Sequence, residues 1–168
     1  VLGLAYTALL VWVVSSSLVL PERIASFFDW QGNAIGWMSR RADLWLMAAL
    51  PLFLVALFWC TARSAVHVPR WLYIPRRDYW LAPERRELTS AVLWQWLLWL
   101  AAVLTISLGA LHMGVVEANT HTPPRFEMAG LIIFLVIVFG SLIICIVGLI
   151  NQFVGAPAAT FRTQVETM

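Results

Sequence analysis

Four long apolar stretches separated by polar segments dominate this chain of 168 residues. The stretches cover residues 1–20, 44–62, 91–111 and 128–150. An α-helix needs about 20 predominantly apolar residues to cross the hydrocarbon core of a bilayer. The pattern therefore predicts an all-α polytopic membrane protein, in which a single domain holds four transmembrane helices in an antiparallel bundle.

The composition agrees with a lipid environment. Hydrophobic residues make up 61% of the chain and charged residues 12%, and the mean hydropathy is +0.82, values that exclude an ordinary soluble domain. The first stretch lacks a basic leading region and a small-residue cleavage site, so we expect a retained helix rather than a signal peptide. The net charge of +2 is small and dispersed, which excludes a nucleic-acid partner and favours membrane lipids as the partners of the arginines.

The arginines predict the orientation, because short cytoplasmic loops retain positive charge during membrane insertion. The loop 63–90 contains six of them, Arg63, Arg70, Arg76, Arg77, Arg85 and Arg86, and the C-terminal tail 151–168 adds Arg162. The opposite side contains four, Arg23, Arg40, Arg41 and Arg125. We therefore expect both termini and the loop 63–90 in the cytoplasm, and the loops 21–43 and 112–127 outside.

The segment after the first apolar stretch reads as a shaped loop, because Gly32 and Gly36 allow turns and Trp30 and Trp37 suit a membrane interface. Its pattern consists of Leu20, Pro21, Phe28, Asp29, Gly32, Gly36, Trp37, Ser39 and Arg40. This pattern resembles the loop after the first helix in a bacterial Sdp-immunity-like membrane family. The family usually has a histidine before the aromatic residue, where this chain has Phe27. The resemblance implies a multi-pass protein of the bacterial cytoplasmic (inner) membrane that acts by binding an external toxin or signal.

Two interpretations of this loop remain open, recognition and purely geometric turn formation. If the loop binds a ligand or partner, the residues that we expect to contribute are Asp29, Gln31, Asn33, Trp37 and Arg40. An external peptide is the ligand that the resemblance implies. Gly32 and Gly36 are expected to be structural.

The loop 74–87 combines prolines, charges and an apolar Tyr-Trp-Leu run. Pro83 followed by Glu84 can open a helix, so the third span is expected to start near Pro83. One interpretation of the apolar run is an interfacial anchor. The alternative is a docking surface for a partner, formed by Tyr79, Trp80 and Arg85.

Chemistry-bearing residues are scarce within the predicted spans, where the polar residues identified are Ser15, Ser16, Ser17, Gln95, Thr105 and Ser107. This pattern predicts neither a transporter nor an enzyme, and it provides no buried carboxylate and no serine, histidine and acid trio. His112, Glu117 and His121 are expected on a solvated rim, with a metal site as the weaker alternative. Cys60 and Cys145 read as packing residues. We predict no cofactor and no metal.

Small residues predict close helix contacts at two places, the pair Ala110 and Gly114 and the pair Gly140 and Gly148. Ten tryptophans give the helices more aromatic surface than a small core covers. A homo-oligomer or an accessory subunit packed against a larger membrane protein is therefore the alternative to a self-contained immunity-like protein.

Overall fold

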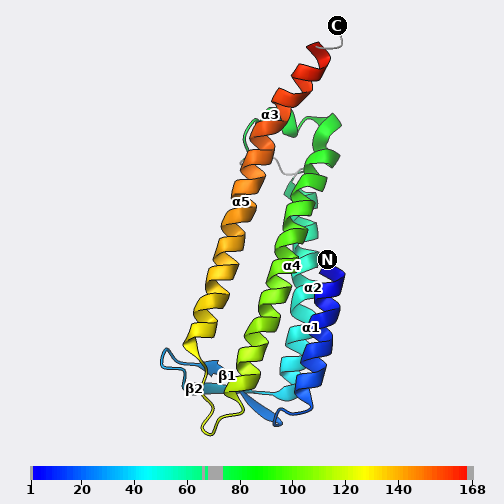
Figure 1. Cartoon of the computed structure of the whole chain (residues 1–168). Coiled ribbons are helices and arrows are strands. Elements are labelled where there is room, and N and C mark those ends of the chain that lie inside the picture. Colours follow the sequence, from blue (N-terminus) through cyan, green and yellow to red (C-terminus); the bar gives the residue numbers. More distant parts are fainter. Residues whose placement is uncertain (1, 66, 68–73, 166–168) are drawn as a thin grey trace.

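The structure is a computed structural model that describes residues 2–65, 67 and 74–165 (Figure 1). Its long helices are α1 (Leu2–Ser17), α2 (Arg40–Ala65), α4 (Arg86–Ala118) and α5 (Met128–Val165). Two short helices, α3 (Arg77–Trp80) and η2 (Pro83–Arg85), precede α4. Strands β1 (Arg23–Phe28) and β2 (Ala34–Ser39) lie between α1 and α2. The predicted helical class is thus confirmed in its main part, with a small sheet added.

Three helical segments are long and apolar enough to cross a membrane: Arg40–Ala65, Pro83–Ala118 and Met128–Val154. The third of the predicted spans begins at Pro83, as the proline indicates. Helix α1 has 16 residues and therefore extends about 24 Å, which is less than a hydrocarbon core of about 30 Å. The membrane-spanning character is confirmed, and within the described residues it rests on three helices rather than four.

Helix α4 is the centre of the arrangement, because it packs against α1, α2 and α5. Helices α1 and α2 also contact each other, so α1, α2 and α4 form a three-helix group. Helix α5 lies along the other side of α4 (Figure 1). The prediction of one antiparallel four-helix bundle is not confirmed, because α5 contacts α4, whereas α1 and α2 contact α4 and each other.

Trp80 connects the elements at one end of the molecule. Its side chain is 3% exposed and packs edge-on against the ring of Phe153 in α5, with 5.1 Å between the ring centroids. Its indole Nε1 donates a hydrogen bond to the Phe153 carbonyl at 2.9 Å, and its own carbonyl accepts one from Thr89 Oγ1 at 2.7 Å. The expectation that Trp80 belongs to a docking surface is therefore wrong, because its ring fills the space between α4 and α5.

The neighbouring residues of the same loop remain closer to the surface. The Arg85 guanidinium lies 3.6 Å from the centroid of the Tyr79 ring, a cation–π contact. Both side chains are half-buried. This contact holds η2 against α3, so it also has a local structural role.

The predicted small-residue contacts differ from one position to the next. Gly148 lies directly against the ring of Trp96, which leaves no room for a side chain between α4 and α5. Gly114 faces the ring of Phe126, where an added Cβ would lie 2.9 Å from Cε2. Ala110 is exposed, and no atom lies within 4 Å of a Cβ built at Gly140.

The loop between α1 and α2 is an antiparallel hairpin, which the sequence pattern did not predict. The register pairs Arg23 with Ser39 at its base and Phe28 with Ala34 near its turn. Figure 1 shows the hairpin at the end of the helices opposite α3, next to the connection between α4 and α5. These two connections meet there and form the candidate site.

Candidate functional site

Asp29 organises the turn of the hairpin. Its Oδ1 accepts hydrogen bonds from the backbone N–H groups of Gln31 and Asn33 at 2.9 and 2.8 Å, and its Oδ2 accepts one from Asn33 Nδ2 at 3.0 Å. The bond from the Asn33 side chain is the main reason why the pKa of Asp29 lies below its usual value. The carboxylate is therefore occupied by its own turn, although the sequence suggested that it faces a ligand.

The segment 119–127 is fixed to this turn through Gly32 and Phe126. The Phe126 N–H donates to the Gly32 carbonyl at 2.8 Å, and Asn33 and Arg125 form an isolated antiparallel bridge. Gly32 has a φ of +82°, and a Cβ at this position would overlap the Phe126 carbonyl oxygen. The ring of Phe126 packs against Phe28, with 5.1 Å between centroids. Glycine is thus required at position 32 for two independent reasons.

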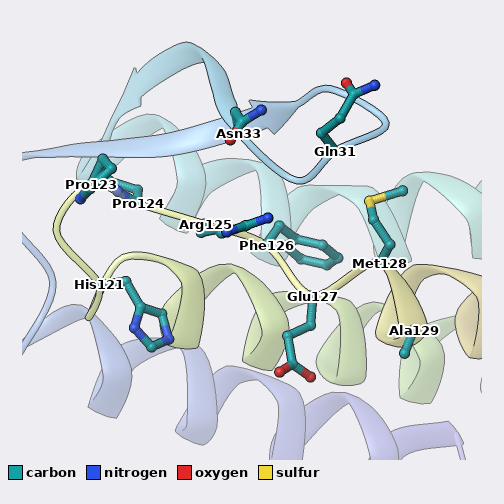
Figure 2. Close-up of a pocket in the computed structure, with 10 residues that line it drawn as sticks. All are labelled: Gln31, Asn33, His121, Pro123, Pro124, Arg125, Phe126, Glu127, Met128 and Ala129. Carbon is teal, nitrogen blue, oxygen red and sulfur yellow. The ribbon is translucent and has the colours of Figure 1, made fainter.

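A cleft of about 680 Å³ lies where the hairpin turn meets this segment. Its lining consists of Gln31, Asn33, His121, Pro123, Pro124, Arg125, Phe126, Glu127, Met128 and Ala129 (Figure 2). In Figure 2 the amide side chains of Gln31 and Asn33 lie on the hairpin side, and His121 and Glu127 lie on the far side of the 121–127 segment. Two of the residues expected to face a ligand, Gln31 and Asn33, therefore line the cleft.

The other three expected residues of this loop, Asp29, Trp37 and Arg40, lie outside that lining. Trp37 is about half exposed on β2. Arg40 begins α2, and its Nη1 donates to the carbonyls of Ser17 and Leu20 at 3.1 and 2.9 Å. The Ser17 carbonyl ends α1 and the Leu20 carbonyl belongs to the turn that follows, so Arg40 fastens the end of α1 to the start of α2.

A buried polar trio lies among α1, α2 and α4, near the end of the helices that carries the hairpin (Figure 1). Ser16 Oγ is 2.8 Å from His112 Nε2, and His112 Nδ1 is 3.4 Å from Asp43 Oδ2. The side chain of His112 is 1% exposed and Asp43 is 4% exposed. Two expectations are therefore wrong: the helices do contain a buried carboxylate, and His112 belongs to the interior rather than to a solvated rim. Glu117 and His121 are exposed.

The order of atoms in this trio is that of a hydrolytic triad, with serine at Nε2 and the acid at Nδ1. The surroundings differ from those of an active site. Ser16 is buried among three helices, and its hydroxyl also lies 3.0 Å from the Val13 carbonyl of its own helix. An acyl substrate would have to enter between packed helices to reach Ser16 Oγ. The geometry thus shows a polar contact that joins three helices in the interior.

Metal binding at the rim finds no geometric support in the part of the chain that the structure describes. No group of three or more histidine, cysteine, aspartate or glutamate residues is placed there as ligands for one ion. The alternative for His112, Glu117 and His121 fails because His112 points inward to Ser16 and Asp43.

Comparisons of the chain with models of protein families, with curated proteins and with solved structures find no match. The cleft and the trio are therefore interpreted from their own geometry.

Proposed function

We propose that this protein is a non-enzymatic membrane protein that binds an external peptide in the cleft beside the hairpin. The observation that carries the proposal is the cleft itself. The hairpin turn and the segment 119–127 form its walls, and the hydrogen bond from Phe126 N–H to the Gly32 carbonyl joins them. Its lining offers side-chain amides at Gln31 and Asn33, charges of both signs at Arg125 and Glu127, and an apolar surface. A peptide needs this mixture of groups, because its backbone is polar, its termini are charged and its side chains vary.

The resemblance to the Sdp-immunity-like family supports an immunity or signal role for this binding. Several residues of the shared loop pattern build the hairpin and its supports, namely Asp29 in the turn, Gly32 against Phe126 and Arg40 at the base. Phe27, which replaces the family's usual histidine, is exposed and covers Gly36, where an added Cβ would lie 2.8 Å from its ring. In this proposal the pattern supplies the scaffold, and Gln31 and Asn33 supply the contacts.

The arginine distribution supports an orientation in the bacterial inner membrane with the hairpin outside and the loop 63–90 and the C-terminus in the cytoplasm. An N-terminus in the cytoplasm as well requires that α1 makes the fourth crossing. Labelling with a membrane-impermeant maleimide tests this orientation in intact cells. In a variant that lacks Cys60 and Cys145, a cysteine at position 31 should react without permeabilisation. A cysteine at Glu84, which is exposed at the α3 end, should react after permeabilisation.

The second candidate is an accessory subunit of a larger membrane assembly, and α5 is the observation that favours it. This helix packs on α4, whereas a row of its apolar side chains is exposed, including Ile133, Val136, Ile143 and Val147. Another membrane helix could cover that face, as lipid could. Tyr79 and Arg85 would then belong to the cytoplasmic side of such an interface.

Photo-crosslinking in native membranes separates the two candidates. A photoreactive residue at Gln31 should yield a peptide adduct, and the adduct should disappear when Met128→Trp fills the cleft. The control position is Ile35, which is exposed on β2 and is not among the residues of the cleft. An adduct with a membrane protein from position 143 would support the subunit role. Absence of a cleft-dependent adduct at position 31 would overturn peptide binding.

A further inference from the structure

The trio of Asp43, His112 and Ser16 places two ionisable side chains inside an otherwise apolar group of helices. Ionisable residues within membrane-spanning helices are costly, and they commonly mark paths or sites for ions and protons. Asp43 comes from α2, His112 from α4 and Ser16 from α1, so each of the three packed helices contributes one member. Neither peptide binding nor the hairpin needs this arrangement for its own contacts.

The positions of the protons follow from the hydrogen-bond geometry. Ser16 has one hydroxyl proton and two acceptors within reach, the Val13 carbonyl at 3.0 Å and His112 Nε2 at 2.8 Å. When Nε2 carries a proton, it donates to Ser16 Oγ, and the Ser16 hydroxyl donates its own proton to the Val13 carbonyl. When Nε2 is bare, Ser16 must divide its proton between the two acceptors. Full satisfaction of these atoms therefore requires a proton on Nε2.

The hydrogen-bond geometry at the other ring nitrogen, His112 Nδ1, requires a second proton. His112 Nδ1 is buried and has no partner within hydrogen-bond geometry, although Asp43 Oδ2 lies 3.4 Å away. With a proton on Nδ1 or on Oδ2, the pair has no net charge. Without that proton, a lone pair faces a carboxylate and the buried pair carries a net negative charge. Such a charge is costly in an apolar interior.

The surroundings provide little compensation for that charge. Helix α1 contains no charged residue over Leu2–Ser17, and α5 contains none between residues 128 and 154. On α2, the guanidinium of Arg40 keeps its charge but is directed at the carbonyls of Ser17 and Leu20, and Arg41 is exposed to solvent. On α4 and β1, Glu117 and Arg23 are exposed to solvent. A second proton on the pair, besides the one on Nε2, is thus what makes the pair itself neutral.

We propose that the trio of Asp43, His112 and Ser16 is a proton-binding site. Its protonation determines how tightly α1, α2 and α4 pack at the end that carries the hairpin. With the second proton bound, the trio joins the three helices. When the proton leaves, the net charge draws water between α2 and α4 and loosens them.

This site is connected to the hairpin at two points. Arg40, one turn before Asp43, ties α2 to the end of α1, and its own N–H donates to the Glu22 carbonyl at 2.9 Å. Asn119, two turns after His112, is hydrogen-bonded to β1. Proton release at the trio should therefore reach the base of the hairpin through both helices.

Thermal unfolding and amide hydrogen exchange in detergent micelles, measured across pH, test the proposal. The Tm of the wild-type protein should fall as pH rises, and amides 23–39 should exchange faster than the chemical effect of pH explains. One linked proton changes the packing equilibrium about tenfold per pH unit. His112→Gln alone leaves the buried carboxyl of Asp43 to titrate, so the dependence should be lost only when both ionisable groups are removed, in Asp43→Asn with His112→Gln. The matched control is His121→Gln, which removes an exposed histidine close by and should retain the dependence.

A double variant, Asp43→Asn with His112→Gln, guards against a failure to fold, because it keeps polar side chains at both positions and removes both ionisable groups. It should fold and show no excess pH dependence. The proposal is overturned if the double variant retains the wild-type pH dependence, or if His121→Gln abolishes it. Peptide crosslinking at position 31 at one fixed pH is a separate measurement, so either proposal can fail alone.

Discussion

Asn119 and Ala25 form a reciprocal pair of hydrogen bonds that fastens the end of α4 to β1. The Ala25 N–H donates to Asn119 Oδ1 at 2.8 Å, and Asn119 Nδ2 donates to the Ala25 carbonyl at 3.0 Å. Nδ2 also reaches the Val115 carbonyl of its own helix at 2.8 Å. Ala25 is fully buried, so its backbone groups at the free edge of β1 need partners. The Asn119 side chain bonds to both of them, as a neighbouring strand would. This pair fixes the hairpin to the end of α4, the helix that contains His112 of the trio.

Asn119→Ala should destabilise the hairpin more than any nearby surface change. It leaves the N–H and the carbonyl of Ala25 buried without partners, which costs about 2 kcal/mol or more in the free energy of unfolding. Hydrogen exchange of the amides 23–28 should accelerate accordingly. Thr120→Ala is the control, because Thr120 Oγ1 bonds to the Glu117 carbonyl of its own turn and is exposed. Equal exchange in the two variants would contradict the role of Asn119.

Gly32→Ala should separate the hairpin turn from the segment 119–127. The substitution places a side chain at a φ of +82° and against the Phe126 carbonyl, and the left-handed conformation alone costs about 1 kcal/mol. The hydrogen bond from Phe126 N–H to Gly32 should weaken, and the cleft should lose its shape. Gly130→Ala is the matched control, because no atom lies within 4 Å of a Cβ built there. Faster exchange at Phe126 in Gly32→Ala, and not in Gly130→Ala, is the expected result.

Much of the fold could be predicted because lipid imposes a simple rule. Long apolar runs, the proline at position 83 and the glycine at position 32 follow from element length and backbone geometry, and these features recur in the structure. The hairpin could not be predicted in the same way. Half-buried and exposed residues alternate regularly along β2, but burial does not alternate regularly along β1, and the pairing of the two strands has register shifts near Phe27. Its fixation depends on Asn119, 94 residues away from Ala25.

The trio escaped prediction because its members come from three helices. Asp43 lies in the first turn of α2, and His112 lies six residues before the end of α4, positions that read as membrane rims in sequence. Packing places both of them inside, and Ser16 appeared as one of three similar serines. One signal was available: Asp43 and His112 both adjoin apolar residues on the same predicted side of the membrane. This placement alone would have allowed the prediction that the side chains of Asp43 and His112 contact each other.

Trp80→Phe should loosen the contact between α3, α4 and α5 at the end opposite the hairpin. The smaller ring removes the hydrogen bond to the Phe153 carbonyl and leaves a gap, which together cost about 2 kcal/mol or more. Unfolding in detergent, followed by circular dichroism, measures the loss. Trp59→Phe serves for comparison, because Trp59 is 54% exposed on α2. A larger effect at position 59 would argue against a structural role for Trp80.

Gly148→Ala should lower the free energy of unfolding and Gly140→Ala should raise it, although both add one methyl group to α5. At position 148 the added methyl group overlaps the Trp96 ring, so α4 and α5 must move apart, at a cost of about 1 to 3 kcal/mol. At position 140 the methyl group meets nothing within 4 Å, and alanine raises helix propensity by about 1 kcal/mol. Unfolding free energies of the two variants decide the point. Similar values would show that Trp96 adapts without moving α5.

The hairpin turn should become less stable in acid because of Asp29. Its folded pKa lies below the ordinary value of about 3.9, chiefly through the bond from the Asn33 side chain, so the unfolded turn takes up a proton first. The stabilisation is present above pH 4 and is lost as pH falls through the folded pKa. Amide exchange at Gln31 and Asn33, corrected for its intrinsic pH dependence, should show increased opening below about pH 4. Asp29→Asn removes the titrating group, so its turn should open to the same extent at pH 3 and pH 6. An acid response that persists in this variant would assign the effect to another carboxylate.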